Sequence, residues 1–208
     1  MRLSIHLPRD LREWPTMIYH VVYSAVLDLR YGGLLMGGLT SRYADQGANE
    51  VNNSDYGVLA NVFRGRISDD DVLVDLGCGK GRVINAWLHL GYQNPMVGVE
   101  LDPEVAARTR KRLARFDNVT IITGDAIEYI PTDGTVFFLY NPFDRPVWVR
   151  LKSRLEALFP KGSGVTLLYL KAEHADVFAD DPKWNVEMMD VSTSKWNPSP
   201  PLAVITRA

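Results

Sequence analysis

The stretch Asp71-Val72-Leu73-Val74-Asp75-Leu76-Gly77-Cys78-Gly79-Lys80-Gly81-Arg82-Val83 decides the fold of this chain of 208 residues. Its first half is an almost continuous apolar run, which is typical of a short strand covered on both faces of a sheet. Gly77, Gly79 and Gly81 follow at alternate positions, so the backbone can turn sharply and a ligand can approach the main chain. A helix that begins after them directs its N–H groups and positive dipole end at the turn. The stretch therefore predicts a strand, a ligand-binding turn and a helix.

The glycine spacing excludes two phosphate-binding motifs. A dinucleotide fingerprint needs a glycine three places after the second one, where this chain has Arg82. A P-loop needs Ser or Thr after Gly-Lys, and here Gly81 follows Lys80. The pattern that remains is Asp-x-Gly-x-Gly-x-Gly, with Asp75 two places before the first glycine. A strand–turn–helix junction that binds no ligand is the alternative.

Composition narrows the class of protein. Hydrophobic residues make up 46% and charged residues 23%, as in ordinary soluble globular proteins. Because the net charge is −2, no general basic surface favours nucleic acid as a partner. Cys78 is the one cysteine, which excludes an internal disulfide and a cysteine-rich metal site; we expect no metal and a reducing, cytoplasmic location. No apolar run has the length of a signal peptide or a membrane span, so no membrane association is expected.

The first third of the chain has a different pattern from the rest. Residues 1–12 predict an extended arm, and apolar residues at helical spacing predict a helix over 14–29. The glycine-rich residues 34–53 are either disordered or a functional loop that folds over a ligand. A second helix is expected from residue 54 or 55 to 66. We interpret residues 1–66 as an N-terminal helical extension that serves as a lid, with Tyr31, Tyr43 and Tyr56 placed to close over a ligand and exclude water.

Residues 67–208 predict the main domain, an α/β fold in which strands and helices alternate around a mostly parallel sheet with helices on both faces. Five strands are expected at residues 72–76, 96–101, 119–123, 136–140 and 165–170. The helices between and after them are expected at residues 81–90, 102–116, 126–130, 146–159 and 173–179. Two last strands, 184–191 and 202–206, have no helix between them and should pair as an antiparallel hairpin.

Polar residues stand at the carboxyl ends of the first four expected strands. These are Asp75, Glu100, Asp125 and Asn141. In an open α/β sheet a ligand binds outside the carboxyl ends of the strands, near the point where the strand order reverses. The four side chains therefore predict one shared site.

Four segments resemble motifs I to IV of class I S-adenosylmethionine-dependent methyltransferases, in order along the chain. They are Asp75-Leu76-Gly77-Cys78-Gly79-Lys80-Gly81-Arg82, Gly98-Val99-Glu100-Leu101-Asp102, Gly124-Asp125-Ala126 and Asn141-Pro142-Phe143. The Rossmann-like, seven-stranded sheet with its last strand antiparallel is similar to the sheet of that family, and the resemblance covers residues 68–208. The Gly-Lys-Gly-Arg form also resembles the Dot1-like lysine methyltransferases.

The resemblance implies S-adenosylmethionine as cofactor and S-adenosylhomocysteine as product. The cofactor carboxylate suits the helix N-terminus after the glycines, and its ammonium group suits Asp75. Glu100 is the candidate acceptor for both ribose hydroxyls, unless it is a helix-start charge, a role for which Asp102 is better placed. Asp125 is the candidate for the adenine amine, alongside an N-cap role. The full expected cofactor set is Asp75, Gly77, Cys78, Gly79, Gly81, Glu100, Leu101, Asp125, Ala126 and Asn141.

The acceptor side is expected around the fourth strand end. Asn141-Pro142-Phe143 is similar to the Asn-Pro-Pro-Tyr/Phe motif of amine-methylating members but has one proline fewer; an Asn-Pro turn is the alternative. We predict Asn141, Asp144 and His174 as catalytic residues, the last two as candidate bases. Tyr56, Pro142 and Phe143 are predicted to contact the substrate.

These patterns predict a methyltransferase that acts on a small-molecule acceptor at a nitrogen, oxygen or carbon atom. No recognisable docking module for protein or nucleic acid is present, which favours a small acceptor. A Dot1-like protein-lysine methyltransferase and a non-catalytic cofactor-binding regulatory protein are the alternatives. The basic run Arg108, Arg110, Lys111, Arg112 and Arg115 is interpreted as a solvated helix face. The sequence does not indicate an oligomeric state.

Overall fold

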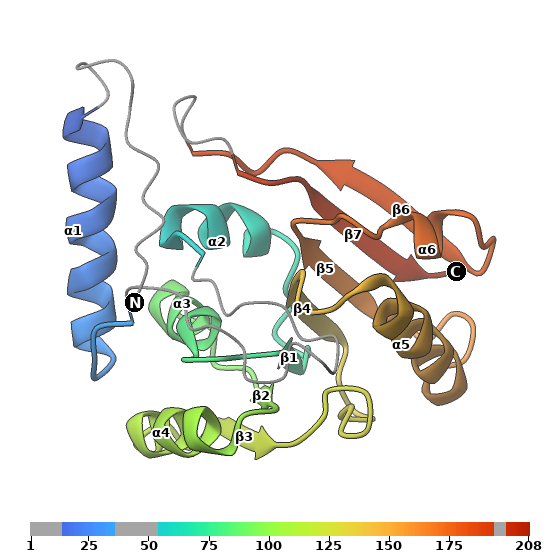
Figure 1. The fold of residues 1–208 in the computed structure, drawn as a ribbon, viewed down its shortest axis with the longest axis horizontal. Coiled ribbons are helices and arrows are strands. Elements are labelled where there is room, and N and C mark those ends of the chain that lie inside the picture. Colours follow the sequence, from blue (N-terminus) through green and yellow to red (C-terminus); the bar gives the residue numbers. More distant parts are fainter. Residues whose placement is uncertain (1–13, 36–53, 194–198) are drawn as a thin grey trace.

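The computed structural model describes residues 14–35, 54–193 and 199–208. The arm expected at 1–12, Tyr43 and most of the loop expected at 34–53 lie outside these ranges. A seven-stranded sheet in the order β3-β2-β1-β4-β5-β7-β6 forms the centre of the protein (Figure 1). The strands are β1 (Leu73–Leu76), β2 (Met96–Glu100), β3 (Val119–Thr123), β4 (Val136–Tyr140), β5 (Thr166–Leu170), β6 (Trp184–Met189) and β7 (Leu202–Arg207).

The sheet confirms the predicted topology. β1 pairs in parallel with β2 and β4, β2 with β3, and β4 with β5. β7 is inserted between β5 and β6 and is antiparallel to both. The sequence order reverses at β1, whose two parallel neighbours are β2 and β4, so the predicted site lies at this switch point.

The helices follow the prediction with one clear error. They are α1 (Trp14–Arg30), α2 (Tyr56–Phe63), α3 (Arg82–Leu90), α4 (Pro103–Leu113), α5 (Arg145–Leu158) and the single turn α6 (Asp176–Ala179). The helix expected at residues 126–130 is wrong, because this segment is a turn. Ile130 precedes Pro131, and a residue before proline is disfavoured in helical conformation. None of the helices in the described ranges is both long enough and apolar enough to cross a membrane.

Two apolar cores cover the two faces of the sheet. On one face, α2 and α3 pack their buried side chains, Leu59 and Trp87 among them, against Leu73 of β1 and Phe138 of β4. On the other face, α5 packs against the alternate strand residues, such as Val74. Successive residues of a strand point to opposite faces, so a central parallel strand must be apolar on both. The burial of all four residues of β1 confirms the interpretation of the apolar run.

Helix α2 is held in the first core by fully buried side chains. Leu59, Val62 and Phe63 are each 0% exposed, and the ring of Phe63 lies 5.4 Å from those of both Trp87 and Phe138. The segment that precedes β1 therefore contributes directly to packing on the sheet.

Replacing Leu59 by Ala should lower the free energy of unfolding by about 2–5 kcal/mol, the cost of a cavity in a packed core. Urea denaturation measures this change. The matched control is Val149→Ala on α5, where the side chain is exposed and the change should stay within about 0.5 kcal/mol. Equal effects of the two substitutions would show that α2 packs only loosely on the sheet.

Candidate active site

The glycine turn between β1 and α3 has the backbone that the sequence predicts. Gly77, Gly79 and Gly81 have φ angles of 85°, 51° and 76°, a region that residues with a side chain avoid. A Cβ atom added to Gly77 would lie 3.2 Å from Cβ of Pro142, in the loop after β4. The turn therefore lies directly against the end of β4.

Glu100, at the end of β2, is hydrogen-bonded to the glycine turn. Its side chain is 7% exposed, and Oε2 accepts from the backbone N–H of Gly79 at 2.7 Å while Oε1 accepts from that of Asp102 at 2.8 Å. Asp102 is the N-cap of α4, since its Oδ1 accepts from Glu104 N at 2.9 Å and Val105 N at 3.1 Å. Glu100 is therefore not the helix cap, and its carboxylate lies beside the turn.

Asp75 has a buried oxygen atom without a partner. The residue is 3% exposed, and Oδ2 makes no hydrogen bond among the described residues. Burial, and secondarily the nearby Glu100, raises the pKa of this carboxyl well above its usual range. A buried acceptor without a donor is costly, and a cationic N–H donor from a ligand would satisfy it. This fits the ammonium group expected at this position.

Cys78 lies within the turn as a packed side chain. It is 6% exposed, and a Cβ added to Gly98 of β2 would lie 2.8 Å from Sγ. Burial, followed by the charges of Asp75 and Glu100, raises the pKa of the thiol well above its usual range. The thiolate is the nucleophilic form, so this environment disfavours a nucleophilic role.

Asn141, after β4, is held by two residues that the sequence analysis missed. Its side chain is 4% exposed, Nδ2 donates to Glu173 Oε2 at 2.9 Å, and the hydroxyl of Tyr169 donates to Oδ1 at 2.7 Å. The backbone N–H of His174 donates to the Tyr169 oxygen at 3.2 Å, which leaves the hydroxyl proton for Asn141. Tyr169 lies in β5 and Glu173 just after it, so the rule of strand carboxyl ends points to both.

Backbone strain is concentrated at the same edge of the sheet. Asn141 has a φ angle of 37° and Lys171 one of 58°, and they are the non-glycine residues with positive φ in the part of the chain that the structure describes. Each follows a strand, β4 or β5, and these strands are neighbours. Such conformations cost about 1–3 kcal/mol each and are found most often at functional sites.

The central part of the chain is similar to known proteins. Residues 73–157 match the family model of a methyltransferase domain. The ribosomal RNA small subunit methyltransferase A of Syntrophus aciditrophicus (strain SB) is 28% identical over 83 residues, which are 36% of this chain and 27% of that protein. This chain thus matches about a quarter of the length of that curated relative. The residues that match the methyltransferase family model run from β1 to α5 and include the glycine turn.

Solved structures share the fold over larger parts of the chain. An RNA methyltransferase from Salinibacter ruber, in complex with S-adenosyl-L-homocysteine, aligns with a TM-score of 0.54 and 23% identity over 76% of this chain and 92% of that chain. The S-adenosyl-L-homocysteine-bound Podospora anserina methyltransferase PaMTH1 aligns with a TM-score of 0.59 and 14% identity over 99% of this chain and 100% of that chain. The resemblance to class I methyltransferases is confirmed, and S-adenosylmethionine is the cofactor that this domain implies.

The remaining cofactor candidates, Leu101, Asp125 and Ala126, follow β2 and β3. Asp125 follows β3, and its Oδ1 accepts from Ile127 N at 2.8 Å. The N-cap role expected for Asp125 is wrong, because residues 126–129 form a turn and not a helix. Ala126 is 6% exposed and belongs to the core on the α5 face, whereas Leu101, after β2, is half-buried. Their contacts with the cofactor stay predictions.

The acceptor-side candidates lie at the ends of β4 and β5. Phe143 is 9% exposed and packs edge-on against Trp148, with ring centroids 5.9 Å apart. Asp144 is exposed and caps α5 by accepting from Val147 N at 3.2 Å. His174 is half-buried beside β5. The catalytic roles of Asn141, Asp144 and His174, and the substrate contacts of Pro142 and Phe143, stay predictions.

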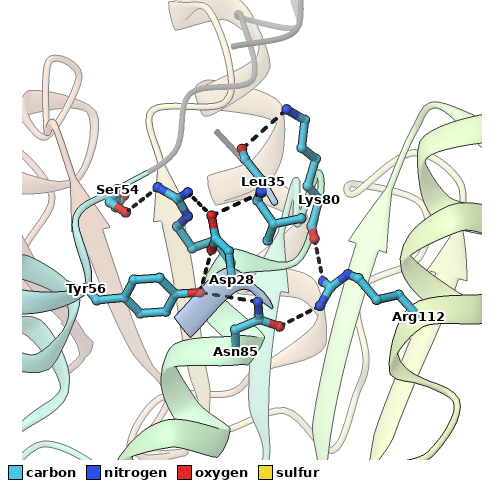
Figure 2. Close-up of polar contacts among 8 residues, drawn as sticks. Asp28, Leu35, Ser54, Tyr56, Lys80, Asn85 and Arg112 are labelled. Carbon is cyan, nitrogen blue, oxygen red and sulfur yellow. Dashed lines mark hydrogen bonds and ion pairs between the residues drawn. The ribbon is translucent and has the colours of Figure 1, made fainter. Parts of the chain in front are cut away.

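Tyr56 occupies a different environment from the one expected of a lid residue. It is 3% exposed; its hydroxyl donates to Asp28 Oδ1 at 2.8 Å and accepts from Asn85 Nδ2 at 3.2 Å (Figure 2). Burial raises the pKa of this phenol. The contact of Tyr56 with substrate stays a prediction, and its hydroxyl is bonded within the protein.

The interpretation of the basic run as a solvated face is wrong for Arg112, which is half-buried, whereas the other four members are exposed. Arg112 donates to Tyr31 O at 2.7 Å, to Asn85 Oδ1 at 2.8 Å and to Lys80 O at 2.6 Å. Arg110 donates to Ile121 O at 2.8 Å. The oxygens that accept from Arg112 belong to residues distant in sequence, and helical periodicity alone does not reveal such partners.

Replacing Asp75 by Asn should make the methyltransferase domain less sensitive to pH and weaken its cofactor site. A carboxyl whose folded pKa is raised favours the protonated folded state, so its contribution to stability is lost as the pH rises above its unfolded pKa of about 3.9. The substitution should therefore reduce the loss of unfolding free energy between pH 5 and 8, while S-adenosylhomocysteine binds at least about tenfold more weakly.

Urea denaturation across this pH range and isothermal titration calorimetry measure the two effects. The exposed Asp133→Asn is the matched control and should change neither. If the wild type and Asp75→Asn lose stability equally as the pH rises, Asp75 is not the buried acid inferred here.

Proposed function

We propose that the protein is an S-adenosylmethionine-dependent methyltransferase that transfers a methyl group to a nitrogen, oxygen or carbon atom of a small molecule. The observation that supports this most directly is that the ends of β2 and β4 meet the glycine turn after β1, Glu100 through its bond to Gly79 and Pro142 by lying against Gly77. The unpartnered oxygen of Asp75 lies buried beside a backbone of positive φ angles. Such a group requires a donor, which an ammonium-bearing cofactor provides.

Each residue then has a definite task. Asp75 would accept from the cofactor ammonium group, Glu100 from the ribose hydroxyls and Asp125 from the adenine amine. The N-terminus of α3 would attract the cofactor carboxylate. Bound in this way, the cofactor supplies a sulfonium methyl group, and the chain aligns the acceptor with it and excludes water.

The acceptor site would be formed by the loop after β4 and the end of β5. The side chain of Asn141 is oriented by Tyr169 and Glu173, which fixes where its oxygen and nitrogen lie. An acceptor that arrives protonated needs a base, and Asp144 and His174 are the candidates.

RNA is the second candidate acceptor. The curated relative is a ribosomal RNA methyltransferase and one similar structure is an RNA methyltransferase, whereas other structures with this fold are methyltransferases of mitomycin and of N-acetylserotonin. The net charge of −2 favours the small acceptor, because nucleic acid binding depends mainly on neutralising phosphate charge. Two alternatives remain: methylation of a lysine side chain of a protein, and cofactor binding without catalysis. The experiment below distinguishes both from methylation of a small molecule.

That experiment combines binding and transfer. Calorimetry with S-adenosylhomocysteine should show one site per chain, and no binding would refute the proposal. S-adenosylmethionine labelled in its methyl group is then incubated with the protein and the small-molecule, RNA and protein fractions of a cell extract. Label should enter the small-molecule fraction. Label in RNA or in protein would assign the acceptor to that class, and binding without transfer would favour a regulatory protein.

Replacing Glu100 by Ala should weaken S-adenosylhomocysteine binding by about 1–3 kcal/mol, the cost of leaving buried hydroxyls without an acceptor. The change also removes the acceptor of the Gly79 N–H. Glu104→Ala in the first turn of α4, where the side chain is 57% exposed, is the matched control. An affinity that survives the loss of Glu100 would remove its assignment to the ribose.

A further inference from the structure

A fully buried carboxylate links the N-terminal helix α1 to the glycine turn. Asp28 is 0% exposed and forms an ion pair through Oδ2 with the guanidinium group of Arg82, itself 8% exposed. Oδ2 also accepts from Leu35 N at 3.0 Å, and Oδ1 accepts from the Tyr56 hydroxyl at 2.8 Å. A buried charge is tolerated only when it is paired and hydrogen-bonded, as it is here.

The contacts continue from Asp28 to the residues that flank the turn (Figure 2). Arg82 is the first residue of α3 and directly follows Gly81. The Tyr56 hydroxyl accepts from Asn85, and Oδ1 of Asn85 accepts from Arg112, which also donates to the carbonyl oxygen of Lys80 within the turn. We call the five side chains Asp28, Tyr56, Arg82, Asn85 and Arg112 the turn network.

The turn is held by backbone hydrogen bonds, such as that from Gly81 N to Cys78 O at 2.8 Å, and by side chains around it. Its three glycines lack side chains, so the geometry of the backbone depends on what surrounds it. The carbonyl oxygen of Lys80 accepts from Arg112, and that of Gly79 accepts from the hydroxyl of Thr109 at 2.9 Å. The surrounding side chains thus fix the peptide groups that a ligand would meet, and a fixed site binds more tightly than one that must be ordered first.

We propose that Asp28 is a positioning residue for the cofactor turn, acting through Arg82 and the rest of the turn network, so that cofactor affinity depends on the docking of α1. This rests on the proposed function, because it assigns the turn to S-adenosylmethionine. Coupling of this kind is reciprocal: the cofactor must stabilise the docked state of α1 by the same free energy that docking adds to its binding.

The packing of α1 is consistent with such coupling. Its buried residues are Met17, Ser24, Leu27 and Asp28, whereas Ile18, Val22 and Val26 are more than half exposed. The helix lies at the edge of the protein, beside α3 (Figure 1). Asp28 is therefore the charged anchor in a helix with limited apolar contact to the domain.

The test removes the buried pair without leaving an unpaired charge. The double variant Asp28→Asn/Arg82→Met loses both charges and keeps similar side-chain volumes, a replacement that often leaves stability nearly unchanged. Tyr56→Phe is a milder second variant, which removes only the hydroxyl contacts of the turn network. Calorimetry with S-adenosylhomocysteine, and amide hydrogen exchange of residues 77–82 without ligand, are measured on the full chain.

We expect the double variant to bind S-adenosylhomocysteine about tenfold more weakly and to exchange faster at residues 79–82, with Tyr56→Phe showing a smaller change in the same direction. The stability control is Asn94→Ala. Asn94 is 4% exposed, and its Nδ2 donates to Ser68 O and Asp71 O, both at 2.8 Å, at the opposite ends of the strands from the turn. This variant should lower the melting temperature and leave affinity within about twofold.

The outcomes separate the two proposals. Unchanged exchange at residues 79–82 in the double variant, or an equal loss of affinity in Asn94→Ala, would overturn the positioning role of Asp28. If the wild type does not bind S-adenosylhomocysteine, the proposed function fails, while the exchange measurement still decides whether the turn network orders the turn. Reciprocity adds a further requirement: S-adenosylhomocysteine must slow exchange in α1 of the wild type more than in α1 of the double variant.

Discussion

The parallel pairing of β1 with β2 on one side and β4 on the other is the constraint on which the site depends. Parallel strands end at the same edge of a sheet, and the chain order reverses at β1, so the loops after β1 and β4 diverge to opposite faces and leave room between them. Hydrogen bonding of Gly79 to Glu100 and packing of Gly77 on Pro142 then join three strand ends into one structure. Without this register, Asp75, Glu100 and Asn141 would be separate polar residues on separate loops.

The elements of the fold that could be predicted are those that depend on patterns of neighbouring residues. Strand β1, the glycine turn and the start of α3 all lie within thirteen residues, and the apolar run and the three glycines of that stretch predict them. Alternation of strands and helices then fixes the sheet, because parallel crossovers allow few arrangements. The residues at strand ends were predictable for the same reason: once the sheet is known, its carboxyl edge is known, and Asp75, Glu100, Asp125 and Asn141 stand on it.

What the sequence did not reveal are partners that meet only in three dimensions. Nothing near Asp28 indicates that it pairs with Arg82, 54 residues later, or that Arg112 reaches the carbonyl oxygen of Lys80. The basic run in and after α4 has the spacing of a solvated face, yet Arg112 is half-buried and donates to carbonyl oxygens just after α1 and within the turn. The short helix expected near residue 128 failed for a local reason instead, since Pro131 limits the residue before it.

The site concentrates features that oppose stability in the protein alone. Asp75 has a buried oxygen without a partner, and Asn141 and Lys171 adopt strained backbone conformations. The glycines of the turn lose more conformational entropy on folding than other residues do. Other polar groups at this edge have partners: Asn141 bonds to Tyr169 and Glu173, and Glu100 accepts from two backbone N–H groups. Asp28 of α1 accepts from three donors. Among the described residues, the other buried side-chain atoms without a partner are N–H donors of Arg82, Trp87 and Trp148, so the oxygen of Asp75 is the one acceptor of this kind. We interpret this oxygen as the acceptor for a donor group of the ligand. The unpartnered oxygen lowers the stability of the free protein, and ligand binding removes that cost.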